Sequence, residues 1–217
     1  MKKLYITLLT GLFCASFSTN SFSYERYALD KVLMTKKCAT SYQTCDLKRA
    51  DLRGRKLNKL YARRAKMSGA QLQYANLRGA DLRHAHLDFA NLSGADLTNA
   101  DLRGAYLHDA NVSGAIFKGA LLDKANLRKV DARDAHFKNA KIRKANLNHG
   151  DFRDADFTGV NMRRTKQHGA NFRGAIFKGT RQHQIHQPHN TLFDPSKKRL
   201  HVPVHVRLVH AIHRQKQ

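Results

Sequence analysis

The sequence of 217 residues has no tryptophan, only three prolines and three cysteines, and few acidic residues. Its 41% hydrophobic content nevertheless argues against a disordered chain, and no apolar run approaches the roughly 20 residues of a membrane-spanning helix. Nucleophile motifs, glycine-rich phosphate loops and HExxH zinc motifs are all missing. We therefore expect a protein that is not an enzyme and has no small-molecule substrate, cofactor or bound metal.

The scarcity of acids leaves a strongly basic chain. There are 40 Lys and Arg against 16 Asp and Glu, which gives a formal net charge of +24. An excess of this size predicts attraction to polyanions and carries no information about the fold.

The first 23 residues have the pattern of a cleaved signal peptide. Lys2 and Lys3 precede an apolar segment at 4–17, and the run Ser21-Phe22-Ser23 supplies small residues for a cleavage site before Tyr24. A membrane anchor is the alternative, but an apolar segment of 14 residues is short for one. We expect a periplasmic or secreted protein.

Two cysteines, Cys38 and Cys45, lie beyond this cleavage site. In an oxidising compartment, a pair seven positions apart is able to close a small disulfide loop, which makes these two residues the disulfide candidate. The alternative is that Cys45 is simply a small buried residue.

The sequence from Cys45 to Gly179 repeats every five residues without insertion, in 27 units. Typical units are Ala-Asn-Leu-Arg-Gly at 75–79 and Ala-Asp-Leu-Thr-Asn at 95–99. A helix needs apolar residues three and four positions apart, and a strand needs alternation, so neither has this period. One small and one large apolar residue in every five predict a coil that turns a corner at each repeat, with its first and third residues inward.

These A-(D/N)-L-x-x units resemble the pentapeptide-repeat family over about two thirds of the chain. The resemblance implies an all-β, right-handed, four-sided β-solenoid with four repeats per coil, so that 27 repeats make roughly 7 coils. Each coil would bury its apolar residues against the coils above and below it. We accordingly assign residues 45–179 to the solenoid and residues 24–44 to an N-terminal cap.

Residues 180–217 form a basic, histidine-rich C-terminal tail. Valine and leucine alternate with polar residues at 201–208, which predicts a strand that Pro203 confines to a sheet edge and that is able to cap the solenoid. Seven of the 13 histidines lie in the tail, without Cys or Glu partners and at spacings unlike a closed zinc motif. We interpret them as groups that gain charge in acid and not as metal ligands.

Four repeats per coil assign each outward residue to one of four faces. The face centred on the third residues from Ala62 to Met162 carries ten cations and three acids, or +7, whereas the face opposite, from Leu52 to Phe172, carries −1. Such a stripe is able to neutralise a row of phosphates or sulfates and release their counterions. The ten candidate polyanion-binding residues are Arg63, Arg64, Arg83, Arg103, Lys124, Lys141, Arg143, Lys144, Arg163 and Arg164.

These features lead to the hypothesis of an exported binding module that docks its basic face on lipopolysaccharide, anionic lipid, nucleic acid or an acidic protein. The alternatives are a scaffold for protein contacts, as a monomer or homodimer, and a secreted effector that acts on a host protein. A scaffold would use the outward apolar residues, which are Tyr74, Phe89, Tyr106, Ile116, Leu121 and Ile176. One branch of the resembled family mimics DNA and protects type II topoisomerases, but mimicry needs an acidic surface, and this chain has the opposite charge.

Overall fold

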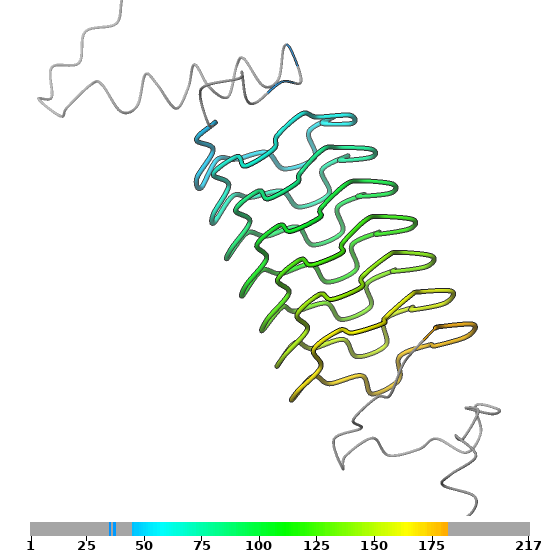
Figure 1. The fold of residues 1–217 in the computed structure, drawn as a ribbon. Helices are drawn as coiled ribbons and strands as arrows, with labels where there is room; N and C mark the ends of the chain where they lie inside the picture. Colours follow the sequence, from blue (N-terminus) through cyan, green and yellow to red (C-terminus); the bar gives the residue numbers. More distant parts are fainter. Residues whose placement is uncertain (1–34, 36, 38–44, 182–217) are drawn as a thin grey trace, which may run out of the picture. The chain divides into compact units, whose positions relative to one another are not determined.

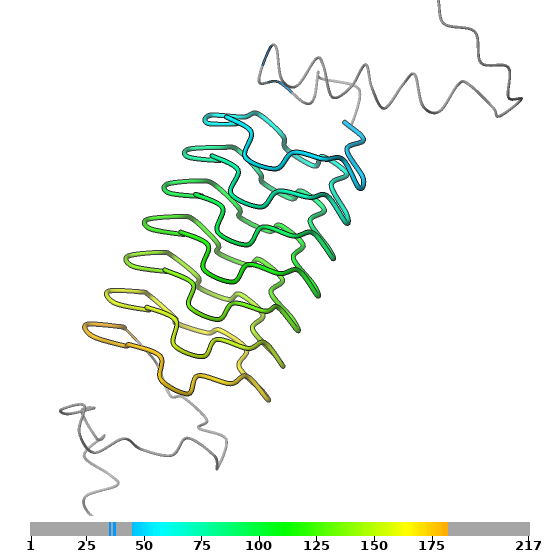
Figure 2. The same cartoon turned by 180° about the vertical axis from the view of Figure 1, so that it is seen from behind.

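The computed structural model describes residues 35, 37 and 45–181, of which residues 45–181 form a stack of similar coils (Figure 1). Parallel β-bridges join the second residue of each repeat to the residue 20 positions later, from Asp46 and Lys66 to Asn161 and Arg181. Four repeats therefore complete one coil. In residues 45–181 the pairing occurs at single residues, one in each repeat, and not in longer strands. Figure 2 shows the same stack from behind.

Each repeat ends in a tight turn that makes one corner of the coil. The N–H of the next repeat's first residue donates to the carbonyl of the third residue, as Ala75 does to Leu72 at 3.0 Å. The fifth residue has a positive φ at every fifth position from 49 to 179, in 16 non-glycine residues and 11 glycines. A positive φ at the third of four turn residues is typical of a type II turn.

Four of the five backbone N–H groups in a repeat have backbone acceptors. In the repeat that begins at Ala95, the N–H of Ala95 bonds within the turn, and that of Asp96 bonds to the previous coil. The N–H groups of Leu97 and Asn99 bond to the next coil, and all four distances are 2.8–3.0 Å. The remaining N–H belongs to the fourth residue, Thr98, and donates to Oδ1 of Asp96 at 2.9 Å.

This last bond explains why the second residue of a repeat is so often Asp or Asn. In fifteen of the described repeats, its side-chain oxygen accepts the N–H of the residue two positions later. A backbone N–H without an acceptor is unfavourable, so an Asp or Asn side chain completes the hydrogen bonding of the repeat.

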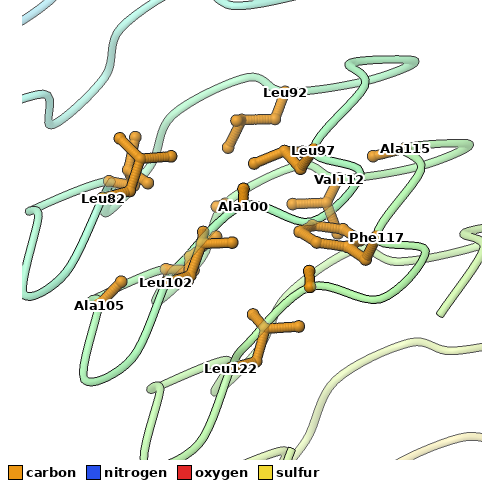
Figure 3. Close-up of a cluster of buried hydrophobic side chains, with 14 of the residues drawn as sticks. Leu82, Leu92, Leu97, Ala100, Leu102, Ala105, Val112, Ala115, Phe117 and Leu122 are labelled. Atoms are coloured by element: carbon orange, nitrogen blue, oxygen red, sulfur yellow. The ribbon is translucent and has the colours of Figure 1, made fainter. Parts of the chain in front are cut away.

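The interior is filled by the first and third residues of the repeats, as predicted. Figure 3 shows Leu97, Leu102 and Phe117 among the side chains that pack inside the coils, and none of the three is exposed to solvent. The third residues of successive coils stack in columns. The longest aromatic column consists of Phe117, Phe137, Phe157 and Phe177, whose neighbouring ring centroids are 4.9, 4.9 and 5.3 Å apart.

The ladder of hydrogen bonds extends two residues past the predicted end at Gly179. The N–H of Arg181 donates to the carbonyl of Val160 at 2.9 Å, and Arg181 also pairs with Asn161. Near the other end, Lys37 forms a parallel bridge with Tyr61.

The other predicted segments fall mostly outside the described residues. These are the signal peptide at 1–23, the cap at 24–44 apart from residues 35 and 37, and the tail from residue 182 onward. In the described part of the chain, no helix is both long enough and apolar enough to cross a membrane.

Candidate anion-binding face

The ten cations predicted to bind polyanions occupy a single face of the solenoid. They belong to the six repeats that begin at 60, 80, 100, 120, 140 and 160. Bridges join the second residues of these repeats in one continuous line, from Tyr61 through Asp101 to Asn161. The outward residues of the six repeats therefore lie above one another.

Two of the ten cations are already paired with an acid of their own repeat. Nε and Nη2 of Arg83 donate to the two carboxylate oxygens of Asp81 at 2.8 and 2.5 Å, and Arg103 binds Asp101 in the same way at 2.9 and 2.6 Å. The second and fourth residues of a repeat are two positions apart, so their side chains leave the extended backbone on the same side. Two-point pairs of this kind are the stronger form of ion pair.

The titration of these groups reflects the pairing. Partial burial acts to raise the pKa of Asp101, but hydrogen bonds from the side chain and backbone of Arg103 outweigh it and hold this pKa below its usual range. The bond to Asp101 also raises the pKa of Arg103, and the bond to Asp81 raises that of Arg83. The pair of Asp101 and Arg103 is therefore a neutral unit across the physiological pH range.

A third predicted cation, Arg143, is paired with an acid of the previous coil. Its Nη2 donates to Oδ2 of Asp123 at 2.6 Å, and this bond raises the pKa of Arg143. Its backbone N–H also donates to Oδ1 of Asp123, at 2.8 Å.

The excess positive charge of the face is thus carried by fewer residues than the sequence suggested. Arg83, Arg103 and Arg143 are compensated, whereas the other seven have no ion pair in the part of the chain that the structure describes. The seven are Arg63, Arg64, Lys124, Lys141, Lys144, Arg163 and Arg164. Two lie in the first of the six repeats and five in the last three, so the free charge is concentrated toward the C-terminal end of the face.

The same local pairing occurs on the opposite face. Arg53 binds Asp51 in its own repeat, with Nη2 2.7 Å from Oδ2, and the repeats that contain Asp131 and Asp151 are alike. The hydrogen bond from the Arg53 side chain lowers the pKa of Asp51 to about 2. An Asp-x-Arg sequence thus forms an ion pair on either face, and the sequence spacing alone is a signal for it.

Two sequence profiles match the chain. One, described as pentapeptide repeats, covers residues 45–83 and 80–119, and the other, described as a pentapeptide repeat region, covers residues 110–186. The chain belongs to the pentapeptide-repeat family. Its fold is accordingly the right-handed β-solenoid of that family, which confirms the resemblance seen in the sequence.

Solved structures of other pentapeptide-repeat proteins are similar to this chain at low identity. HetL, involved in heterocyst differentiation regulation in the cyanobacterium Nostoc, is 20% identical, with a TM-score of 0.46 over 70% of this chain and 92% of that one. Rfr23 from the cyanobacterium Cyanothece is 22% identical, with a TM-score of 0.42 over 70% and 98%.

The fluoroquinolone resistance protein QnrB1, which is plasmid-mediated, is a third similar structure. It is 20% identical, with a TM-score of 0.30 over 64% of this chain and 78% of that one. No curated protein matches this pentapeptide-repeat chain.

The outward apolar residues of this pentapeptide-repeat protein differ in how far they are exposed to solvent. Tyr74 and Phe89 are 76% and 64% exposed, and Tyr106 is 42% exposed, whereas Ile116 and Leu121 are half-buried. Phe89 and Tyr106 lie on the face next to the basic one. The ring of Tyr106 stacks on that of His86 at 4.8 Å, and Phe89 contacts His108 edge-on at 6.0 Å.

Only one of the two cysteines predicted to form a disulfide, Cys45, is among the described residues. Cys45 is buried and disulfide-bonded. Cys38 lies outside the described residues, so the pairing of Cys38 with Cys45 stays a prediction. Among the described residues, no group of three or more His, Cys, Asp or Glu side chains is arranged to hold a metal ion.

Proposed function

We propose that this protein is an exported, non-enzymatic binding module whose basic face docks on an anionic partner. The candidate partners are lipopolysaccharide, anionic lipid, nucleic acid and an acidic protein. The observation that supports this function is the group of seven cations on one face with no ion pair among the described residues.

The physical basis is the difference between free and compensated cations. A free Lys or Arg gains a partner when it meets a phosphate or sulfate, and the counterions of the polyanion are released. Arg83, Arg103 and Arg143 already have carboxylate partners, so binding an anion would require them to exchange one partner for another. The seven unpaired cations are therefore the expected contacts.

The test is chromatography of residues 24–217 on immobilised heparin and on immobilised lipopolysaccharide, each with a salt gradient. The wild-type protein is expected to elute at high salt. A variant in which all seven unpaired cations are replaced by glutamine is expected to elute early, because the electrostatic contacts that salt weakens are gone.

A charge-balanced variant is the control. Asp81→Asn and Asp101→Asn combined with Arg83→Gln and Arg103→Gln remove two cations and two acids from the same face while asparagine keeps each backbone acceptor. This variant is expected to elute with the wild type. Co-elution of the sevenfold variant with the wild type contradicts the proposed function.

A second candidate function is a scaffold for protein contacts, which includes a homodimer or a secreted effector that acts on a host protein. The specific observation in its favour is the cluster of Phe89, Tyr106, His86 and His108 on the face beside the basic one. An apolar contact does not weaken with added salt, so sedimentation velocity at low and high salt separates it from polyanion binding. A salt-resistant dimer that Phe89→Ser and Tyr106→Ser disrupt would favour the scaffold.

A further inference from the structure

One column of residues on the basic face contains less glycine than the corresponding positions of the other three faces. It consists of the fifth residues of the six repeats, which are Arg64, His84, Gly104, Lys124, Lys144 and Arg164. All six have a positive φ, between 55° and 66°. Glycine takes one of these six positions, whereas it takes ten of the 21 fifth positions on the other three faces.

The first unfavourable feature of this column is backbone strain. A side chain in the left-handed region brings its Cβ close to the following carbonyl, and glycine avoids this contact. Asn, Asp and His are the side chains most often tolerated there. Lys124, Lys144 and Arg164 are none of these, and each is exposed, so burial of the side chain does not offset the strain.

The second unfavourable feature is repulsion between like charges. Lys124, Lys144 and Arg164 stand directly above one another, one coil apart, a step of about 4.8 Å. Like charges opposite each other on neighbouring strands are destabilising. Within the described chain, no acid forms an ion pair with any of the three. A column that has both strain and repulsion is best explained by a ligand that compensates the charge.

We propose that Lys124, Lys144 and Arg164 form the anion-binding column of this face, and that its ligand is a flexible single chain bearing phosphate or sulfate groups, lying parallel to the solenoid axis. This inference rests on the proposed function and specifies its ligand class. Arg83, Arg103 and Arg143 act in folding and make no contact with the ligand.

The geometry of the column favours a flexible single chain over a duplex or a membrane. The three cations form a straight line with equal steps of about 4.8 Å. The phosphates of one strand of duplex DNA advance about 3.4 Å per nucleotide along the helix axis, and the strand winds away from any straight line. A flexible chain adjusts its spacing to meet successive cations. A flat anionic membrane would engage Lys141 and Arg163 as strongly as the column.

The experiment compares two triple-glycine variants of residues 24–217. The first replaces Lys124, Lys144 and Arg164. The matched control replaces Arg49, Lys59 and Lys129, which are also exposed, unpaired in the described chain and in positive-φ positions, but lie on other faces. Both variants lose three charges and relieve three strained positions, so neither is expected to melt below the wild type.

Binding is measured by fluorescence anisotropy over a salt series with four labelled probes. These are an oligothymidylate, its duplex with oligodeoxyadenylate, a size-defined heparin oligosaccharide and vesicles containing phosphatidylglycerol. For a single strand, each lost contact lowers the magnitude of the slope of log K against log salt by about 0.7. The column variant is expected to lose about 2 in slope with the oligothymidylate or to show a reduced slope with the heparin probe, and the control is expected to lose none. The probe that responds identifies phosphate or sulfate as the preferred group.

The outcomes that overturn the inference differ from those that overturn the proposed function. Equal losses in the column and control variants mean that only net charge matters, and tighter binding to duplex or vesicles than to single chains excludes the ligand class. Either result overturns the column and leaves the basic face as a binding surface. Absence of wild-type binding to all four probes overturns the column, and absence of retention on immobilised heparin and lipopolysaccharide as well overturns the proposed binding of polyanions. A triple-asparagine version of the column variant, which keeps a side chain at each position, must show the same loss.

Discussion

The carboxylate of Asp123 accepts hydrogen bonds from Arg143 across one coil, from its backbone N–H at 2.8 Å and from Nε and Nη2 of its guanidinium at 3.1 and 2.6 Å. In most repeats the N–H of the fourth residue is accepted by an Asp or Asn two positions earlier, but here that position is Lys141, which has no acceptor. Asp123 supplies the missing acceptor from the previous coil. A repeat that lacks Asp or Asn at its second position is thus completed by a neighbour.

The first prediction concerns this compensation. Asp123→Ala removes the acceptor of the Arg143 N–H and is expected to lower the free energy of unfolding by about 1 kcal/mol, measured by urea denaturation. It also frees the Arg143 guanidinium, so retention on heparin should increase. Adding Lys141→Asn restores an acceptor within the repeat and should recover most of the lost stability. If the double variant loses as much stability as the sum of the two single variants, Asp123 does not replace the acceptor that Lys141 lacks.

The second prediction tests the aromatic column. Phe137 is buried between Phe117 and Phe157, so Phe137→Ala is expected to cost about 3–5 kcal/mol in unfolding free energy. Phe177, at the end of the same column, is half-buried, and Phe177→Ala should cost clearly less. Thermal and urea unfolding of the two variants provide the comparison, and equal losses would show that stacking between coils is unimportant.

The third prediction separates the acceptor role of Asp96 from its charge. Thr98 is only 7% exposed, so its N–H depends on Oδ1 of Asp96. Asp96→Ala should cost about 1–3 kcal/mol because a buried donor loses its acceptor. Asp96→Asn keeps the acceptor and should cost less, since it forfeits mainly the charge on the bond to Arg78. A larger loss for asparagine than for alanine in urea unfolding would contradict the acceptor role.

The fourth prediction concerns acid. The hydrogen bond from the Arg133 side chain lowers the pKa of Asp131, so this carboxylate contributes stability above its unfolded pKa, near 3.9. That contribution is lost as the pH falls through the lower pKa of the folded state. The stability advantage of the wild type over Asp131→Asn should therefore be constant above about pH 5 and shrink below pH 4. A stability advantage that grows in acid would show that folding raises the pKa of Asp131 and does not lower it.

The repeat made the fold and the inward residues predictable. One small and one large apolar residue in every five identify the buried positions, and Leu97 and Ala100 are indeed fully buried. The 20-residue coil then places residues such as Asp81 and Asp101 one above the other, which the bridges confirm.

The pairing of charges was less predictable, because counting charges treats each side chain as independent. The two-residue spacing of Asp81 and Arg83 is visible in the sequence and was a usable signal for an ion pair. The bond from Arg143 to Asp123 was not visible in this way, because it depends on the register between coils and on the lack of an acceptor at Lys141. The left-handed conformation of Lys124 was equally hidden, since the turn imposes it against the preference of the residue.

The 20-residue period also limits how such a chain is able to change length in evolution. Insertion or removal of a single five-residue repeat preserves the inward residues, yet it carries every residue after it a quarter turn around the rod. Loss of one repeat between residues 65 and 119 would separate Lys124, Lys144 and Arg164 from Arg63 and Arg64 and place them on the adjoining side. Only the gain or loss of four repeats at once leaves the surface pattern aligned. The core therefore tolerates a change of any number of repeats, whereas a binding surface tolerates only a change of whole coils.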